Sequence, residues 1–117
     1  MLKIYEYKNC STCKKAIKFL DSSDLEYKAI PIVDQPPSKA EIKKMLSYLD
    51  GDIKKLFNTS GQVYREMGLK EQLPNMSSTE AIELLSEHGK LIKRPFLIGK
   101  DFGTVGFKED RWSDLLL

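Results

Sequence analysis

Two cysteines, Cys10 and Cys13, lie where the hydrophobic pattern of the chain changes from that of a strand to that of a helix. This change limits the folds that the chain can adopt. Residues 2–7, before it, are apolar, aromatic and β-branched, which predicts a short strand. After it, apolar side chains recur at helical spacing from Cys13 to Leu20. Residues 25–33 then predict a second strand. Strand, helix and strand in so short a segment indicate a compact βαβ unit, a motif that is almost always right-handed.

Residues 38–88 are predicted to be entirely helical. Two capping boxes begin the longest helices of this segment, Ser38 with Glu41 and Ser77 with Glu80. Asp50-Gly51 ends the first of them, and Gly89 is expected just beyond the end of the last. Shorter helical pieces are expected at 53–57 and 63–68.

The end of the chain returns to strand-like sequence. Residues 96–98 and 104–107 predict a hairpin, and Asp110 is expected to cap a closing helix. That helix would turn Trp112, Leu115 and Leu116 inward. The element order is typical of a thioredoxin-like α/β fold, with a four-stranded mixed sheet and an all-helical insertion. We expect one domain over 1–117, with its core in 1–37 and 89–117 and its insertion in 38–88, and Pro31 marks an edge strand.

Composition excludes several classes of protein. The 117 residues include 19 Lys and Arg against 17 Asp and Glu, interleaved along the chain, so charge gives no support to direct nucleic-acid binding. No apolar stretch approaches the ~20 residues that cross a bilayer, which argues against membrane insertion. The first residues lack the apolar segment of a signal peptide. We therefore expect a cytoplasmic protein, in a compartment where structural disulfides are rare.

The motif Cys10-Ser11-Thr12-Cys13 is the strongest chemical signal in the chain. A CxxC inside a βαβ pattern is typical of a redox pair. Because Cys10 falls at the start of a helix, the free N–H groups there favour a negative charge on its sulfur. Cys10 is thus the expected nucleophile, and the deeper Cys13 is the expected resolving thiol. Two alternatives stay open: ordinary buried cysteines, or a zinc site, for which the chain offers only His88 as a further Cys or His ligand.

Arg94-Pro95 forms a second constellation, because a proline inside a strand-like run needs an edge or a special geometry. In thioredoxin-like folds the equivalent proline is cis and packs beside the CxxC. Arg94 would then project near Cys10 and stabilise a thiolate or an oxyanion. The alternative is a surface arginine before an edge proline.

Nearly the whole chain resembles the ArsC/Spx family of thioredoxin-fold proteins, in its Spx/MgsR-type subgroup. The segments that carry the resemblance are Cys10-Ser11-Thr12-Cys13-Lys14-Lys15-Ala16, Asn58-Thr59-Ser60-Gly61 with Tyr64-Arg65-Glu66, Lys93-Arg94-Pro95 and Val105-Gly106-Phe107. The family contains glutaredoxin-coupled arsenate reductases and Spx-type regulators that bind RNA polymerase. Arsenate reductases of the family hold the oxyanion with three arginines, and only Arg94 matches. Asn58 and Thr104 stand where the others are expected, so the resemblance does not imply arsenate reduction.

The resemblance and the motif together predict a thiol–disulfide oxidoreductase. Its catalytic residues are Cys10, Cys13 and Arg94, and its substrate-binding residues are Ser11, Thr12 and Pro95. A thioredoxin, a glutaredoxin or a low-molecular-weight thiol is the expected reductant, no metal or nucleotide cofactor is implied, and the protein is expected to be a monomer. The alternative is an Spx-like redox-sensing regulator that binds the RNA polymerase α subunit, since Gly51 resembles a glycine on the polymerase-contacting surface of those regulators.

Overall fold

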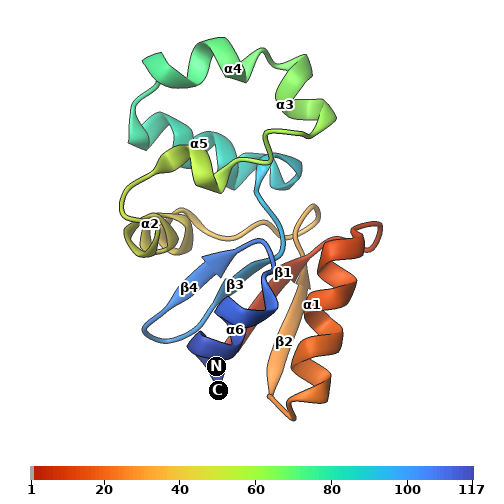
Figure 1. Cartoon of the computed structure of the whole chain (residues 1–117). Coiled ribbons are helices and arrows are strands. Elements are labelled where there is room, and N and C mark those ends of the chain that lie inside the picture. The colour runs from red at the N-terminus through yellow and green to blue at the C-terminus, as the bar shows by residue number, and fades with distance from the viewer. Residues whose placement is uncertain (1) are drawn as a thin grey trace.

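A four-stranded mixed sheet forms the centre of the computed structural model, which describes residues 2–117 (Figure 1). Its strands run in the order β2-β1-β3-β4, with β1 parallel to β2 and the other pairs antiparallel. Their bounds are β1 Leu2–Glu6, β2 Tyr27–Pro31, β3 Phe96–Ile98 and β4 Gly103–Val105. The predicted α/β, thioredoxin-like fold is confirmed. Pro31 ends the edge strand β2, where a missing N–H breaks no ladder bond.

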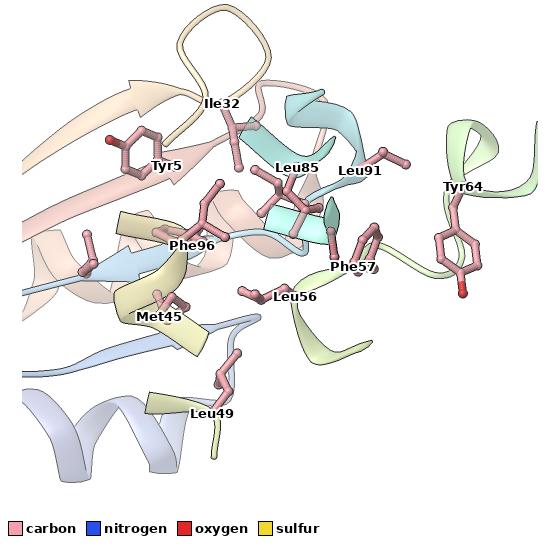
Figure 2. Packing of buried hydrophobic residues seen from close by; sticks show 14 of the residues in the cluster. Tyr5, Ile32, Met45, Leu49, Leu56, Phe57, Tyr64, Leu85, Leu91 and Phe96 are labelled. Atoms are coloured by element: carbon pink, nitrogen blue, oxygen red, sulfur yellow. The ribbon is translucent and has the colours of Figure 1, made fainter. Parts of the chain in front are cut away.

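Helices cover both faces of the sheet, because alternate residues of the central strands point to opposite sides. Ile4 of β1 and Leu97 of β3 pack on helices α1, Ser11–Ser22, and α6, Glu109–Leu116. Tyr5 and Phe96 point the other way, into the larger apolar cluster that Figure 2 shows. That cluster also receives residues of α2, Lys39–Tyr48, and α5, Ser78–Glu87. None of the helices formed by residues 2–117 is long and apolar enough to span a bilayer.

The segment between α2 and β3 is helical, as expected, but it is more finely divided than the sequence indicates. Its short elements are η1 Ile53–Leu56, α3 Gln62–Glu66, α4 Leu69–Gln72, η2 Leu73–Asn75 and η3 Gly89–Leu91. The turns α4 and η2 were not predicted, because pieces of three or four residues are too short to show a period. Figure 1 shows α3 and α4 on the side of α5 that faces away from the sheet.

Helix ends follow the sequence signals at four of the five predicted places. Both capping boxes form, at Ser38 and at Ser77. Asp50 and Gly51 take positive φ values of 58° and 77° and end α2. The prediction for α6 is wrong, because Lys108 is its N-cap residue and Asp110 lies inside the first turn. An acidic residue is favourable there too, since it faces the positive end of the helix dipole.

Candidate functional site

Cys10 is the N-cap residue of α1 and lies in the short connection between strand β1 and that helix. Its extended backbone, with φ −104° and ψ 110°, turns the side chain back over the first turn. The Cys13 N–H donates a hydrogen bond to Cys10 Sγ over 3.2 Å. A free backbone N–H thus points at the sulfur, in the geometry that stabilises a thiolate at a helix start. Cys10 is half-buried and remains accessible from solvent.

Cys13 has a different environment, although both cysteines are free thiols. It is fully buried on the inner face of α1, in line with Ala16 and Leu20. Burial, followed by a hydrogen bond with the Cys10 side chain, raises the pKa of the Cys13 thiol to about 12. A backbone hydrogen bond at Tyr7 and the positive charge of Arg94 lower that pKa without reversing the shift. At neutral pH Cys13 is therefore almost entirely the neutral thiol.

Arg94 lies beside the thiol pair, close enough for its charge to act on Cys13. Its Cζ stands 4.7 Å from the ring centroid of Tyr7, a cation–π contact, and its Nη1 donates to the Lys90 carbonyl over 3.3 Å. Tyr7 was missed as a site residue, and no sequence pattern links it to an arginine 87 positions later. Arg94 is half-buried, and these two contacts fix its head group.

Pro95 is buried, and the Arg94–Pro95 peptide bond is cis. Its carbonyl accepts a hydrogen bond from Gly106 N over 2.8 Å, which ties this loop to the end of β4. Ser11 and Thr12 are exposed in the first turn of α1, with no side-chain hydrogen bond found among the described residues. The structure therefore gathers the six predicted site residues into two segments, the start of α1 and the loop before β3.

Other residues singled out from the sequence lie elsewhere. His88 is the exposed C-cap of α5. Within residues 2–117, no group of three or more His, Cys, Asp or Glu side chains is placed to hold a metal ion. Thr104 is buried at 3% exposure and, with Thr12 and Arg94, lines a groove of about 670 Å³. Sequence analysis missed this groove, since its walls come from segments far apart in the chain.

The unequal environments of the two thiols predict unequal alkylation. In a Cys13→Ser protein, Cys10 should react readily with iodoacetamide at pH 7. In a Cys10→Ser protein, the buried Cys13 should react at least about 100-fold more slowly, because its thiolate is scarce and shielded. Its rate should still be rising well above neutral pH, because burial, the main cause of its raised pKa, remains in this variant. Mass spectrometry of timed samples would measure both rates, and equal rates at pH 7 would contradict the assignment.

A thioredoxin-like sheet, a helical insertion after β2 and a CxxC at the start of α1 define the class of protein. A model of the ArsC family matches residues 5–115. YusI of Bacillus subtilis (strain 168), which is uncharacterised, is 48% identical over 113 residues, covering 97% of this chain and 96% of that protein. The chain belongs to the ArsC family.

Two further comparisons show the range of its relatives. The crystal structure of a possible arsenate reductase from Streptococcus mutans UA159 superposes with a TM-score of 0.91 at 42% identity, over 98% of this chain and 97% of that one. The global transcriptional regulator Spx of Streptococcus agalactiae serotype V is 24% identical over 110 residues, covering 94% of this chain and 79% of that protein. The relatives of this chain thus include a protein described as a possible enzyme and a protein described as a transcriptional regulator.

Proposed function

We propose that the protein is a thiol–disulfide oxidoreductase in which Cys10 and Cys13 form the redox pair. One observation carries the proposal: Cys10 Sγ, accessible at a helix N-cap, accepts the Cys13 N–H over 3.2 Å, while Cys13 is buried as a neutral thiol. A nucleophile needs access and a stabilised anion, and a resolving thiol needs protection from outside oxidants. The two cysteines divide these requirements between them.

The reaction has two exchange steps. Cys10 Sγ, as a thiolate, attacks one sulfur of a substrate disulfide, and the other sulfur leaves as a thiolate that takes up a proton. Cys13, once deprotonated, attacks Cys10 Sγ in the resulting mixed disulfide, and the second substrate sulfur leaves and is protonated. Two electrons have then passed to the substrate, and the protein holds a Cys10–Cys13 disulfide. A thioredoxin, a glutaredoxin or a low-molecular-weight thiol would return the two electrons.

The high pKa of Cys13 suits the order of these steps. Burial is its main cause, but the next cause is the hydrogen bond with Cys10, and the charge of Cys10 adds to it. Both contributions of Cys10 weaken when its sulfur enters a mixed disulfide, because that sulfur then has no negative charge and is only a weak acceptor for the Cys13 S–H. Arg94 still lowers the pKa of Cys13 at that stage. Formation of the mixed disulfide therefore makes Cys13 easier to ionise at the moment when it must attack.

Reversible oxidation tests the redox pair directly. Mild oxidation of the wild-type protein, followed by alkylation, should give a monomer that has lost two hydrogens and carries no label, and a dithiol should restore two labelling sites. The motif places the cysteines one helical turn apart, within disulfide reach after a small adjustment. Oxidation that yields only dimers or small-thiol adducts would rule out Cys13 as the resolving thiol.

Arg94 is proposed to stabilise the anionic sulfur. Replacing Arg94 with Ala should slow alkylation of Cys10 at pH 7 by about tenfold, because a cation at an effective dielectric of about 20 contributes roughly 1–2 kcal/mol after screening. The measurement is the alkylation rate in a Cys13→Ser background. Lys14→Ala serves as the control, since Lys14 is exposed on α1 and should matter less. An unchanged rate in Arg94→Ala would remove Arg94 from the catalytic group.

Reduction of arsenate is not part of the proposal. Asn58 and Thr104 replace two of the three arginines that hold the oxyanion in arsenate reductases of the family, and Thr104 is almost fully buried. An oxyanion would lose two charge-assisted contacts, each worth about 1.5–3 kcal/mol. Arsenate should therefore neither be reduced nor protect Cys10 from alkylation.

A second candidate function is an Spx-like regulator that binds the RNA polymerase α subunit. It is favoured by Gly51, which is exposed in the turn after α2 with φ 77° and has no atom within 4 Å of the position of an added Cβ. Such a bare turn leaves room for a partner surface. A pull-down with the purified C-terminal domain of the α subunit, using reduced and oxidised protein, separates the two functions. Binding that changes with redox state would support the regulator, and no binding in either state would exclude it.

A further inference from the structure

The groove beside the CxxC motif is positively charged, which is not evident from the sequence. One part of its wall comes from the end of α2 and from η1, and another part from β4 and the start of α6. Its charged lining residues comprise six cations, Lys54, Lys55, Lys93, Arg94, Lys108 and Arg111, and two carboxylates, Asp50 and Asp52. The groove thus carries a net charge of +4, whereas the whole chain carries +2. Positive charge is concentrated in this one hollow.

Five of these six cations have no side-chain hydrogen bond or ion pair among residues 2–117, so they are available to a ligand. The two ion pairs found within residues 2–117, Lys3–Glu41 and Lys39–Glu83, lie outside the groove. Of the six cations, Arg94 alone has a side-chain hydrogen bond in this part of the chain, and it is to a neutral carbonyl. Like charges that line a low-dielectric hollow focus the potential and attract anions. The volume of about 670 Å³ lies within the range of about 300–1,000 Å³ that is usual for small-molecule sites.

The groove is placed to receive part of a disulfide substrate. Thr12, between the two cysteines, and Arg94, beside them, line the groove, while Cys10 does not line it. A substrate sulfur at Cys10 would therefore lie outside the groove, and the substituent on that sulfur would extend into it. Val105 and Phe107, which are partly exposed, supply apolar wall for the carbon chain of such a substituent.

Resting on the proposed function, we propose that the groove selects disulfides whose substituents carry carboxylate groups. Such carboxylates occur in small thiol compounds that are built from cysteine. They also occur in acidic peptide segments that contain a cysteine. Lysines that come from separate segments of the chain suit separate carboxylates, since each ammonium acts as a point charge with rotatable donors. Asp50 and Asp52 also line the groove and would repel a ligand with many negative charges. The groove should therefore prefer a ligand with only a few carboxylates.

The test compares small disulfides of similar size and opposite charge. Wild-type protein is reacted with dithiodipropionate, hydroxyethyl disulfide and cystamine, which are anionic, neutral and cationic. Each rate is divided by the rate of the same disulfide with free cysteine, because leaving-thiol pKa alters exchange rates. The anionic disulfide should then exceed the neutral one by about tenfold at low salt. The preference should shrink as salt rises from about 0.01 M to about 0.1 M, when the screening length falls from about 30 Å to about 10 Å.

Paired variants locate the effect. Lys54→Gln with Lys55→Gln removes two cations from one part of the wall, and Lys108→Gln with Arg111→Gln removes two from another part. Each pair should lower the anionic-to-neutral rate ratio at least about threefold. Lys43→Gln with Lys70→Gln removes the same charge at exposed positions outside the groove and should leave the ratio at its wild-type value.

The outcomes separate the two proposals. Equal normalised rates for all three disulfides, or equal losses in the groove and control pairs, would overturn the groove assignment and leave the oxidoreductase proposal standing. No reduction of any disulfide would overturn both. Disulfide-linked dimers of a short Cys peptide flanked by Glu, or by Gln, identify the source of the carboxylates. The Glu-to-Gln rate ratio of the peptide disulfides is then compared with the anionic-to-neutral rate ratio of the small disulfides. A larger peptide ratio would assign an acidic peptide as the substrate, and a smaller one a small-molecule disulfide.

Discussion

Replacing Cys10 with Ser is expected to abolish disulfide reduction, whereas replacing Cys13 with Ser should stop the reaction halfway. A serine hydroxyl does not ionise at neutral pH, so Cys10→Ser should lower the rate on the order of 10³-fold or more. Cys13→Ser keeps the first attack, because Cys10 retains its access and its place at the helix N-cap. Without a resolving thiol, the mixed disulfide should accumulate.

Intact mass measurement distinguishes these states. After incubation with hydroxyethyl disulfide, Cys13→Ser should gain one substrate thiol on Cys10, the wild type should lose two hydrogens, and Cys10→Ser should be unchanged. Lys18→Ala is the control on the same helix, since Lys18 is exposed outside the motif and its loss should leave the wild-type pattern intact. An adduct on Cys13 in the Cys10→Ser protein would reverse the assigned roles.

Local signals predicted much of the fold because they depend on neighbours in the chain. The capping boxes at Ser38 and Ser77 form as expected, since each needs only residues within one helical turn. The helix after Cys10 and the edge position of Pro31 follow from periodicity and from a missing N–H in the same way. These features share one property: the partner atoms lie a few residues apart.

Gly89 shows where local reasoning fails. It follows the C-cap of α5 as expected, but it does not take the left-handed backbone that usually calls for glycine there. Its reason is long-range: a Cβ on Gly89 would lie 2.0 Å from the carbonyl oxygen of Ile32. That approach joins the end of α5 to the segment after β2, and no spacing within the sequence indicates it.

The candidate site divides in the same way. Cys10 and Cys13 were identified from the sequence because a motif and a change of period coincide there. The contact of Arg94 with Tyr7 depends on the pairing of β1 with β3, which brings distant residues together. Lys54 and Lys55 belong to no motif in the sequence, and only the fold brings them to the same groove as Lys108 and Arg111.

Truncating Trp112 to Ala is expected to be the most destabilising single change in the sheet face that α1 covers. Trp112 is fully buried, and its ring centroid lies 4.9 Å from that of Phe107 and 6.2 Å from that of Phe19. Its Nε1–H donates a hydrogen bond to the Gly106 carbonyl over 3.2 Å. Removing a buried Trp side chain costs about 3–5 kcal/mol, since transfer free energy is lost and a cavity remains. The free energy of unfolding should fall by that amount.

Urea denaturation followed by circular dichroism measures this loss, because Trp112 is the single tryptophan and its fluorescence disappears with it. Trp112→Phe keeps a ring between Phe19 and Phe107 but lacks the Nε1–H donor, so it should lose less than Ala, about 1–2 kcal/mol. Asp114→Ala, at an exposed position of the same helix, should stay within about 0.5 kcal/mol of the wild type. A loss below about 1 kcal/mol for Trp112→Ala would mean that α6 is not anchored through this ring. The wall that Lys108 and Arg111 give to the groove would then be held by other contacts of the helix.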